Sequence, residues 1–279
     1  MDQANRAMTV IAGSTPFALG PWLNPANGLR TGEAPPAQFD PARMETVLGT
    51  GWLAERRSRY RIDYGQQQIR LRLGSQLDCR IDADGQWLAL DDARCASVEA
   101  LLGPPLLLAL ARRGIHALHA SAVISPGGQS ALISAPSGSG KSTLARVAEE
   151  QGWQRLADDL SPLDQQGQLR PRFPQLKLGP HPKLLPQSVP LQRLILLRRA
   201  AVTTCRPLST TEVARALLAA TVGARMYSAA MQREHFLWAT EMARQLGDGQ
   251  SAELTLAEDP QDPGRAARRG LAQLLEAWQ

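Results

Sequence analysis

The first half of the chain contains several short segments in which apolar and polar residues alternate. Residues 60–64 and 69–73 both follow this period of two, and a Gly-Gln-Gln turn separates them. Two more short runs, at 77–81 and 87–90, lie on either side of a turn at 83–85. Alternation with this period is typical of a half-buried strand, and the short turns favour antiparallel pairing. The pattern therefore predicts an antiparallel β meander.

The segments on either side of the meander have different patterns. Residues 1–45 are rich in Pro, Gly, Ala and Asn and show no sustained period, which predicts an irregular arm. Residues 97–113 begin at a capping Ser, have a mostly apolar middle and end in two arginines before a Gly. This predicts a linking helix, interrupted by Gly103-Pro104-Pro105. Residues 46–114 are thus expected to form a small β-rich module.

The second half begins with two strand-like runs, at 117–124 and 130–134, that lie only five residues apart. A parallel crossover needs about a dozen residues or more, so these strands are expected to form an antiparallel hairpin. The later patterns predict a helix at 141–152, a strand at 153–157, a hairpin at 160–170, a strand at 191–197, helices at 209–222 and 229–246, a strand at 252–256 and a final helix ending at 278. Residues 115–279 are therefore expected to form one α/β domain with a mixed sheet.

The composition supports a globular protein. The 279 residues are 43% hydrophobic and 20% charged, enough for a sizeable core in one large or two modest domains. No run of about eighteen uncharged apolar residues predicts a membrane span, and the first residues lack a secretory pattern, so we expect a cytoplasmic protein. Three widely spaced cysteines without a Cys-x-x-Cys pair predict reduced thiols and no structural zinc.

The formal net charge is +5, and 28 of the 31 basic residues are arginine rather than lysine. The arginine pairs are scattered along the chain, which favours a solvated surface over nucleic-acid binding. The three lysines are Lys141, Lys177 and Lys183. One of them, Lys141, follows a Gly-rich loop.

That loop is typical of a phosphate-binding site. It lies between the strand at 130–134 and a predicted helix, and Gly138 and Gly140 allow backbone N–H groups to converge on a phosphate. Lys141 would reach the β and γ phosphates, and the Ser142 hydroxyl would ligate Mg²⁺. The first position is Ala rather than Gly. The expected nucleotide-binding residues are Ala135, Pro136, Ser137, Gly138, Ser139, Gly140, Lys141, Ser142 and Thr143.

Two adjacent carboxylates, Asp158 and Asp159, follow the strand at 153–157. Ligands of α/β proteins bind at this end of strands, and neighbouring strand residues point in opposite directions, so one carboxylate can serve Mg²⁺ and the other the acceptor hydroxyl. His119 lies on the hairpin strand before the loop strand. A His on an apolar strand is often a core residue, so a core role and a catalytic role both remain open.

Three segments together resemble the HPr kinase/phosphorylase superfamily, whose nucleotide core is akin to that of the ATP-dependent phosphoenolpyruvate carboxykinases. They are LHASAV at 118–123, APSGSGKSTL at 135–144 and GWQRLADDL at 152–160. The resemblance implies a P-loop kinase domain of this type over residues 115–279. It also implies that Asp158 is the catalytic base toward a Ser hydroxyl, that Asp159 is the magnesium-side carboxylate and that His119 is a catalytic-site residue.

The chain also departs from that family. Residues 170–225 contain no Glu-Arg-Gly signature of the kind linked with phosphorolysis, and the first half does not resemble the usual regulatory domain. The chain looks more like the shorter relatives that phosphorylate lasso-peptide precursors at a Ser. We therefore do not expect HPr to be the substrate, and the sequence leaves open whether any phosphorylase activity is retained.

The sequence predicts an ATP- and Mg²⁺-dependent kinase that phosphorylates a Ser of a protein or peptide, a ribosomally made precursor being one such substrate. The β-rich module would bind that acceptor by strand pairing. A nucleotide-binding switch without phosphotransfer is the alternative, and carboxykinase-like chemistry is disfavoured because clustered ligands for a second metal are lacking. A second cation beside Lys141 is expected, with Lys177 and Arg206 as candidates, although each also fits a surface role. No nucleic acid or membrane is an expected partner, and the oligomeric state, a homo-oligomer included, is left open.

Overall fold

The computed structural model describes residues 9–11, 44–53, 56–74, 77–85, 87–90, 103–136, 138–171, 185–247, 249–257 and 261–278. Its packing divides the chain into two compact units. The first comprises Met1–His116 together with Gly223–Arg233, and the second comprises Ala117–Val222 and Glu234–Gln279. Residues 223–233 thus group with the first unit, although they lie within residues 115–279, which the sequence predicts to form one domain.

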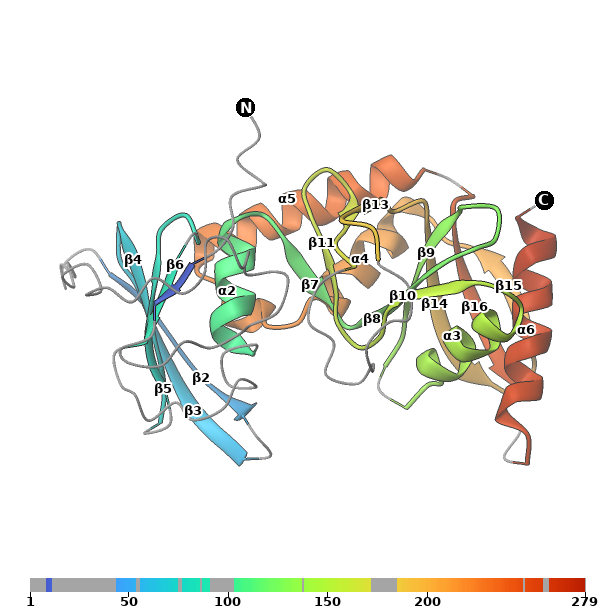
Figure 1. The fold of residues 1–279 in the computed structure, drawn as a ribbon, viewed down its shortest axis with the longest axis horizontal. Helices are drawn as coiled ribbons and strands as arrows, with labels where there is room; N and C mark the ends of the chain where they lie inside the picture. Colours follow the sequence, from blue (N-terminus) through green and yellow to red (C-terminus); the bar gives the residue numbers. More distant parts are fainter. Residues whose placement is uncertain are drawn as a thin grey trace. The chain divides into compact units, whose positions relative to one another are not determined.

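The first unit is built on a six-stranded sheet in the order β1-β6-β5-β4-β3-β2 (Figure 1). Its strands are β1 (Thr9–Ile11), β2 (Glu45–Leu53), β3 (Arg56–Tyr64), β4 (Gln68–Leu73), β5 (Leu77–Asp82) and β6 (Trp87–Leu90). Strands β2 to β6 pair antiparallel in succession, which confirms the predicted meander. The strands β1 and β2 were not predicted, and β1, which pairs parallel with β6, shows that the segment before residue 46 is not irregular throughout.

The alternation along these strands places apolar side chains on one face. Ile62, Leu71 and Ile81 of β3, β4 and β5 are fully buried on that face. Helix α2 (Pro104–Arg112) packs on β5 and β6. It begins at the two prolines that were expected to interrupt it, because Pro fits the first turn of a helix, where N–H groups have no intrahelical acceptor. The predicted helical residues 97–102 lie outside the described part of the chain.

Hydrogen bonds join residues 223–233 to the meander. The Tyr64 hydroxyl donates to the carbonyl of Met226 in the short helix η4 (Ala224–Met226). The Tyr227 hydroxyl lies 3.1 Å from His116 Nδ1. Burial raises the pKa of both tyrosines, so both hydroxyls stay protonated and hydrogen-bonded. These contacts account for the assignment of the segment to the first unit.

The second unit contains a mixed six-stranded sheet in the order β10-β8-β9-β14-β16-β15 and a small sheet in the order β13-β12-β11-β7. The strands are β7 (His116–Leu118), β8 (Ala120–Ile124), β9 (Ser130–Ser134), β10 (Gln154–Ala157), β11 (Ser161–Leu163), β12 (Gln168–Leu169), β13 (Val189–Pro190), β14 (Arg193–Ala200), β15 (Thr204–Pro207) and β16 (Ser251–Ala257). Both predicted hairpins are present, as β8–β9 and β11–β12. The α/β class and the mixed sheet are thus confirmed.

The directions of the strands determine which residues meet at an edge of the larger sheet. β14 runs parallel to both β9 and β16, while β8 runs antiparallel to β9 and to β10. The carboxyl ends of β9, β10, β14 and β16 therefore share one edge with the beginning of β8. This edge, called the loop edge below, is where α/β proteins bind ligands.

Helices cover both faces of this sheet. On one face, α3 (Lys141–Glu150) and α6 (Pro263–Ala277) lie side by side and pack their apolar residues on β9, β14 and β16 (Figure 1). On the other face, residues of α4 (Thr210–Ala220) and α5 (Ala229–Leu246) join the core. None of the described helices has the length and apolar character that a membrane span requires.

Substitution of two glycines in the turns of the meander would test how closely α2 packs on the sheet. Gly85 and Gly74 both have positive φ, at 65° and 51°. A Cβ at Gly85 would lie 2.1 Å from the carbonyl oxygen of Ala109, whereas a Cβ at Gly74 would meet no atom of the described residues within 4 Å. We expect Gly74→Ala to lower the free energy of unfolding by about 1 kcal/mol through backbone strain alone. Gly85→Ala should lower the free energy of unfolding by about 2–4 kcal/mol, because overpacking against Ala109 adds to the backbone strain. Urea unfolding followed by circular dichroism measures both, and equal losses would contradict the close packing.

Candidate phosphate-binding and catalytic site

The Gly-rich loop connects β9 to α3 at the loop edge, in the order the sequence predicted. Gly138 and Gly140 have φ values of 79° and 99°, a left-handed region that glycine adopts without strain. Gly140 is also the N-cap of α3 and has no side chain to occupy the helix start. The amide groups and the positive end of the dipole of α3 are therefore open to an anion. Ser137 lies outside the described residues.

The Lys141 side chain is buried and turned toward the loop. Its ammonium donates to the carbonyl oxygens of Ala135 at 2.9 Å and Pro136 at 3.4 Å. Its Nζ also lies 2.9 Å from His119 Nε2. An ammonium can only donate, so Nε2 of His119 is the acceptor and the ring proton is on Nδ1. A buried cation needs such acceptors, and phosphate oxygens could replace them.

His119 links Lys141 to Asp159. Its Nδ1 lies 3.3 Å from Asp159 Oδ1, and both side chains are about one-third exposed. Among the described residues, Asp159 is the one non-glycine with a positive φ, at 82°. Backbone strain of this kind often occurs at functional sites, and here it accompanies the contact with His119. The structure thus places His119 at the loop edge beside Asp159 rather than inside the apolar core.

Asp158 faces a different set of partners. Its carboxylate is buried, and Oδ1 accepts hydrogen bonds from Ser142 Oγ at 3.1 Å and from Ser121 Oγ at 2.5 Å. Its Oδ2 accepts a longer bond of 3.4 Å from Arg155. Sequence reasoning missed Ser121, although a polar residue within the apolar strand β8, two positions after His119, was a usable signal. The two adjacent carboxylates therefore have separate surroundings.

The oxygen atoms of Ser142 and Asp158 suit a magnesium ion. Mg²⁺ prefers oxygen ligands and is commonly bound by one or two protein groups together with phosphates and water. No group of three or more His, Cys, Asp or Glu side chains gathers at one point in the described part of the chain. One hydroxyl and one carboxylate do not complete a magnesium shell, so an ion held by Ser142 and Asp158 would need further oxygen ligands from phosphate or water.

Of the two predicted second cations, the structure describes Arg206 alone and places it away from the loop. Arg206 lies on β15, which β14 and β16 separate from β9, and it pairs with Glu212 at 2.9 Å and Glu253 at 3.1 Å. Hydrogen bonds to these two carboxylates raise the pKa of Arg206. Lys177 lies outside the described residues. Among the described residues, Arg199 is a cation in addition to Lys141 that contacts the loop, since its Nε donates to the Ser139 carbonyl at 3.0 Å. Sequence reasoning missed Arg199, because its place beside the loop depends on the parallel pairing of β14 with β9.

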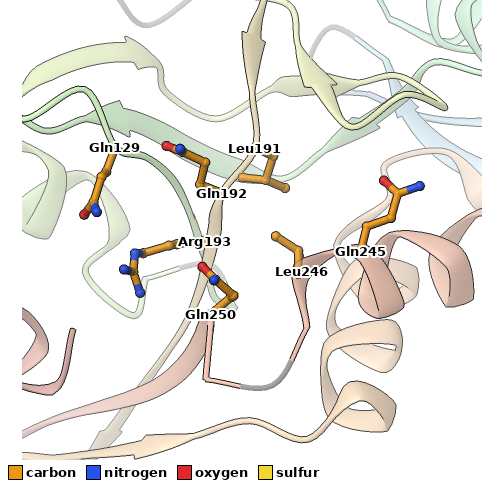
Figure 2. A pocket seen from close by; sticks show the side chains of 7 residues that line it. All are labelled: Gln129, Leu191, Gln192, Arg193, Gln245, Leu246 and Gln250. Atoms are coloured by element: carbon orange, nitrogen blue, oxygen red, sulfur yellow. The ribbon is translucent and has the colours of Figure 1, made fainter. Parts of the chain in front are cut away.

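A hollow of about 360 Å³ lies at the opposite edge of the same sheet. Its lining comes from the residues just before β9 and β16, from residues 191–193 at the start of β14 and from the end of α5. Figure 2 shows these side chains. Four of the seven lining side chains are glutamines: the full set is Gln129, Leu191, Gln192, Arg193, Gln245, Leu246 and Gln250. The loop follows the other end of β9, so this hollow is separate from the candidate phosphate site.

Comparison with protein-family models and with curated proteins finds no match to this chain. The assignment of a function therefore depends on the geometry at the loop edge. That geometry joins three segments that are far apart in the sequence: the start of β8, the loop with α3, and the two residues after β10.

The contacts of Lys141 lead to a binding prediction. Lys141→Ala is expected to weaken Mg-ATP binding by about tenfold or more, because a charge-assisted hydrogen bond to phosphate is lost. Arg146→Ala is the control, since Arg146 lies on the same helix but is exposed and pairs with Glu150. Isothermal titration calorimetry measures both affinities. Equal affinity of the Lys141 variant and the unmodified protein would contradict the assignment of the loop.

Proposed function

We propose that this protein is a Mg-ATP-dependent kinase that transfers the γ-phosphate to a Ser hydroxyl of a protein or peptide. One observation carries the proposal: two neighbouring residues of the loop region each contact a different predicted catalytic residue. Lys141 contacts His119, and Ser142 contacts Asp158. An ordinary Gly-rich helix cap would not need these partners. The resemblance to the HPr kinase superfamily supports the same reading.

In this proposal the loop and Lys141 bind the phosphates of ATP. The backbone N–H groups at the start of α3 would cradle them, and Lys141 would exchange its loop carbonyl acceptors for β and γ oxygens. Ser142 and Asp158 would hold Mg²⁺, which neutralises charge on the phosphate oxygens when it is bound. Phosphoryl transfer depends mostly on positioning and electrostatic stabilisation, so these groups supply most of what the reaction requires.

The contacts favour the opposite division of the two carboxylates from the one the family resemblance implied. Asp158 accepts the hydrogen bond from Ser142, the predicted magnesium ligand, so we assign Asp158 to the metal. Asp159 is more exposed and contacts His119, so we assign this pair to the acceptor. The Asp159–His119 pair accepts the proton of the acceptor Ser hydroxyl while the Oγ of that Ser bonds to the γ phosphorus. The bond between that phosphorus and the bridging oxygen breaks, and its electrons leave with ADP.

The first unit offers a place for an extended acceptor. Strand β2 lies at the end of the sheet order and pairs, among the described residues, with β3 alone. It is nine residues long, and Leu48 near its middle is 70% exposed. A peptide that pairs with such an edge gains main-chain hydrogen bonds and contacts with alternate side chains. We assign acceptor binding to β2.

The test of the function is transfer of labelled γ-phosphate to peptides encoded beside the gene, with phosphoserine located by mass spectrometry. We expect Asp158→Asn to raise the Mg²⁺ concentration required, since the carboxylate near Ser142 loses its charge. Asp159→Asn should leave Mg-ATP binding within about twofold and lower the turnover number by about 100-fold or more, as expected for loss of proton acceptance.

The outcomes separate the alternatives. If the effects of the two variants are exchanged, the division implied by the family resemblance is right and ours is wrong. Binding of Mg-ATP without transfer to any offered protein or peptide would support the nucleotide-binding switch instead.

The position of β2 leads to a prediction about the acceptor. Leu48→Lys should raise the KM for the peptide several-fold, because it removes an exposed apolar contact, and should leave the affinity for Mg-ATP unchanged. Val202→Lys is the matched control, since Val202 is 66% exposed but lies between β14 and β15 of the second unit. Steady-state kinetics with varied peptide measures both. An equal rise of KM in the two variants would remove β2 from the acceptor site.

A further inference from the structure

Arg199 has a distinct position relative to the loop. It is the penultimate residue of β14, beside the strand that leads into the loop. Its Nε donates to the Ser139 carbonyl at 3.0 Å, and its Nη1 contacts the Ala257 carbonyl at 3.5 Å. Its Nη2 lies 2.8 Å from the point that a Cβ of residue 140 would occupy. The guanidinium therefore lies against Gly140, the residue at which α3 begins, and the missing side chain there makes room for it.

The partners of Arg199 differ in kind from those of the nearby arginines. Arg198, the preceding residue, pairs with Glu253 at 2.6 Å, and Arg206 pairs with Glu212 and Glu253. Among the described residues, the acceptors of Arg199 are backbone carbonyls and no carboxylate pairs with it. Carbonyl acceptors satisfy N–H groups without cancelling the charge. A positive charge is thus placed at the loop with no described carboxylate to neutralise it.

We infer that Arg199 is the second phosphate-binding cation of this site, with the polyphosphate of the nucleotide as its ligand. The inference rests on the proposed function and adds to it a residue that the sequence did not identify. The bonds from Nε and Nη1 fix the plane of the guanidinium, and a fixed planar fork loses little conformational entropy when it binds phosphate oxygens. Together with Lys141, Arg199 gives the loop two positive charges for an anion of several negative charges.

The experiment compares three variants by calorimetry, with Mg-ATP and with inorganic tripolyphosphate as probes. Arg199→Gln removes the charge, and Arg199→Lys keeps the charge but loses the fork that holds Ser139. Arg198→Gln is the matched control, because Arg198 is the neighbouring arginine, is 60% exposed and pairs with Glu253. Thermal melting without ligand reports whether each variant folds, and titrations at several salt concentrations report the number of charges that bind the anion.

We expect Arg199→Gln to bind both probes about tenfold or more weakly, with a shallower salt dependence and an unchanged melting temperature. Arg199→Lys should recover part of the affinity, and Arg198→Gln should bind like the unmodified protein. Unchanged affinity in Arg199→Gln would overturn the inference. So would a lower melting temperature with equal losses in the Gln and Lys variants, since that pattern describes a loop anchor.

A separate control distinguishes failure of this inference from failure of the proposed function. If Lys141→Ala loses tripolyphosphate binding while Arg199→Gln does not, the phosphate loop stands and only the role of Arg199 is wrong. If the unmodified protein binds neither probe, the proposed function itself is wrong, and the inference is overturned with it.

Discussion

The buried carboxylate of Asp158 is the constraint on which the candidate site depends. It is only 6% exposed, and burying an ionised carboxylate is costly unless hydrogen-bond donors surround it. The donors come from three segments: Ser121 on β8, Ser142 at the start of α3, and Arg155 on β10. Satisfying this one group therefore fixes the loop, the hairpin strand and the end of β10 relative to one another. The contacts of Lys141 with His119, and of His119 with Asp159, form a second connection at the same edge.

The mixed sheet explains why one edge gathers these groups. Residues that follow parallel strands share an edge, and reversal of β8 brings the residue before its start, His119, to that edge as well. The same rule brings Arg199 to the loop, because β14 runs parallel to β9. It keeps Arg206 away, since its strand β15 is antiparallel and lies beyond β14 and β16. The direction and order of the strands thus decide that Arg199 lies at the loop and Arg206 does not, which the sequence alone did not reveal.

Much of the architecture was readable from the sequence because it follows strong local signals. The period-two runs from Tyr60 onward and the five-residue gap before Ser130 sufficed for the meander and the hairpin. Two of the strands that were not predicted lack such signals. Thr9–Ile11 is too short to show a period, and Thr204–Pro207 is a largely exposed edge strand without an apolar face. The grouping of Gly223–Arg233 with the first unit depends on tertiary hydrogen bonds that no local pattern encodes.

The candidate site was predictable as a set of residues but not as a set of contacts. The motif spacing indicated Lys141, Ser142, the two aspartates and His119, and the structure brings all of them to one edge. Which carboxylate faces Ser142 was not predictable. It depends on the backbone after β10, where Asp159 adopts a positive φ that a simple alternation of strand residues does not describe. Arg199 was missed because its role depends on strand direction rather than on a motif.

A double-mutant cycle between Ser142→Ala and Asp158→Asn tests most directly whether the loop and the aspartate motif act as one site. Mg-ATP affinity is measured by calorimetry for the unmodified protein, the two single variants and the double variant. Residues in contact usually show an interaction energy of about 0.5–3 kcal/mol, and our account predicts a value in that range because Ser142 donates to Asp158. If the loss of Mg-ATP binding free energy in the double variant equals the sum of the losses in the two single variants within about 0.3–0.5 kcal/mol, the two residues act independently and the account is contradicted.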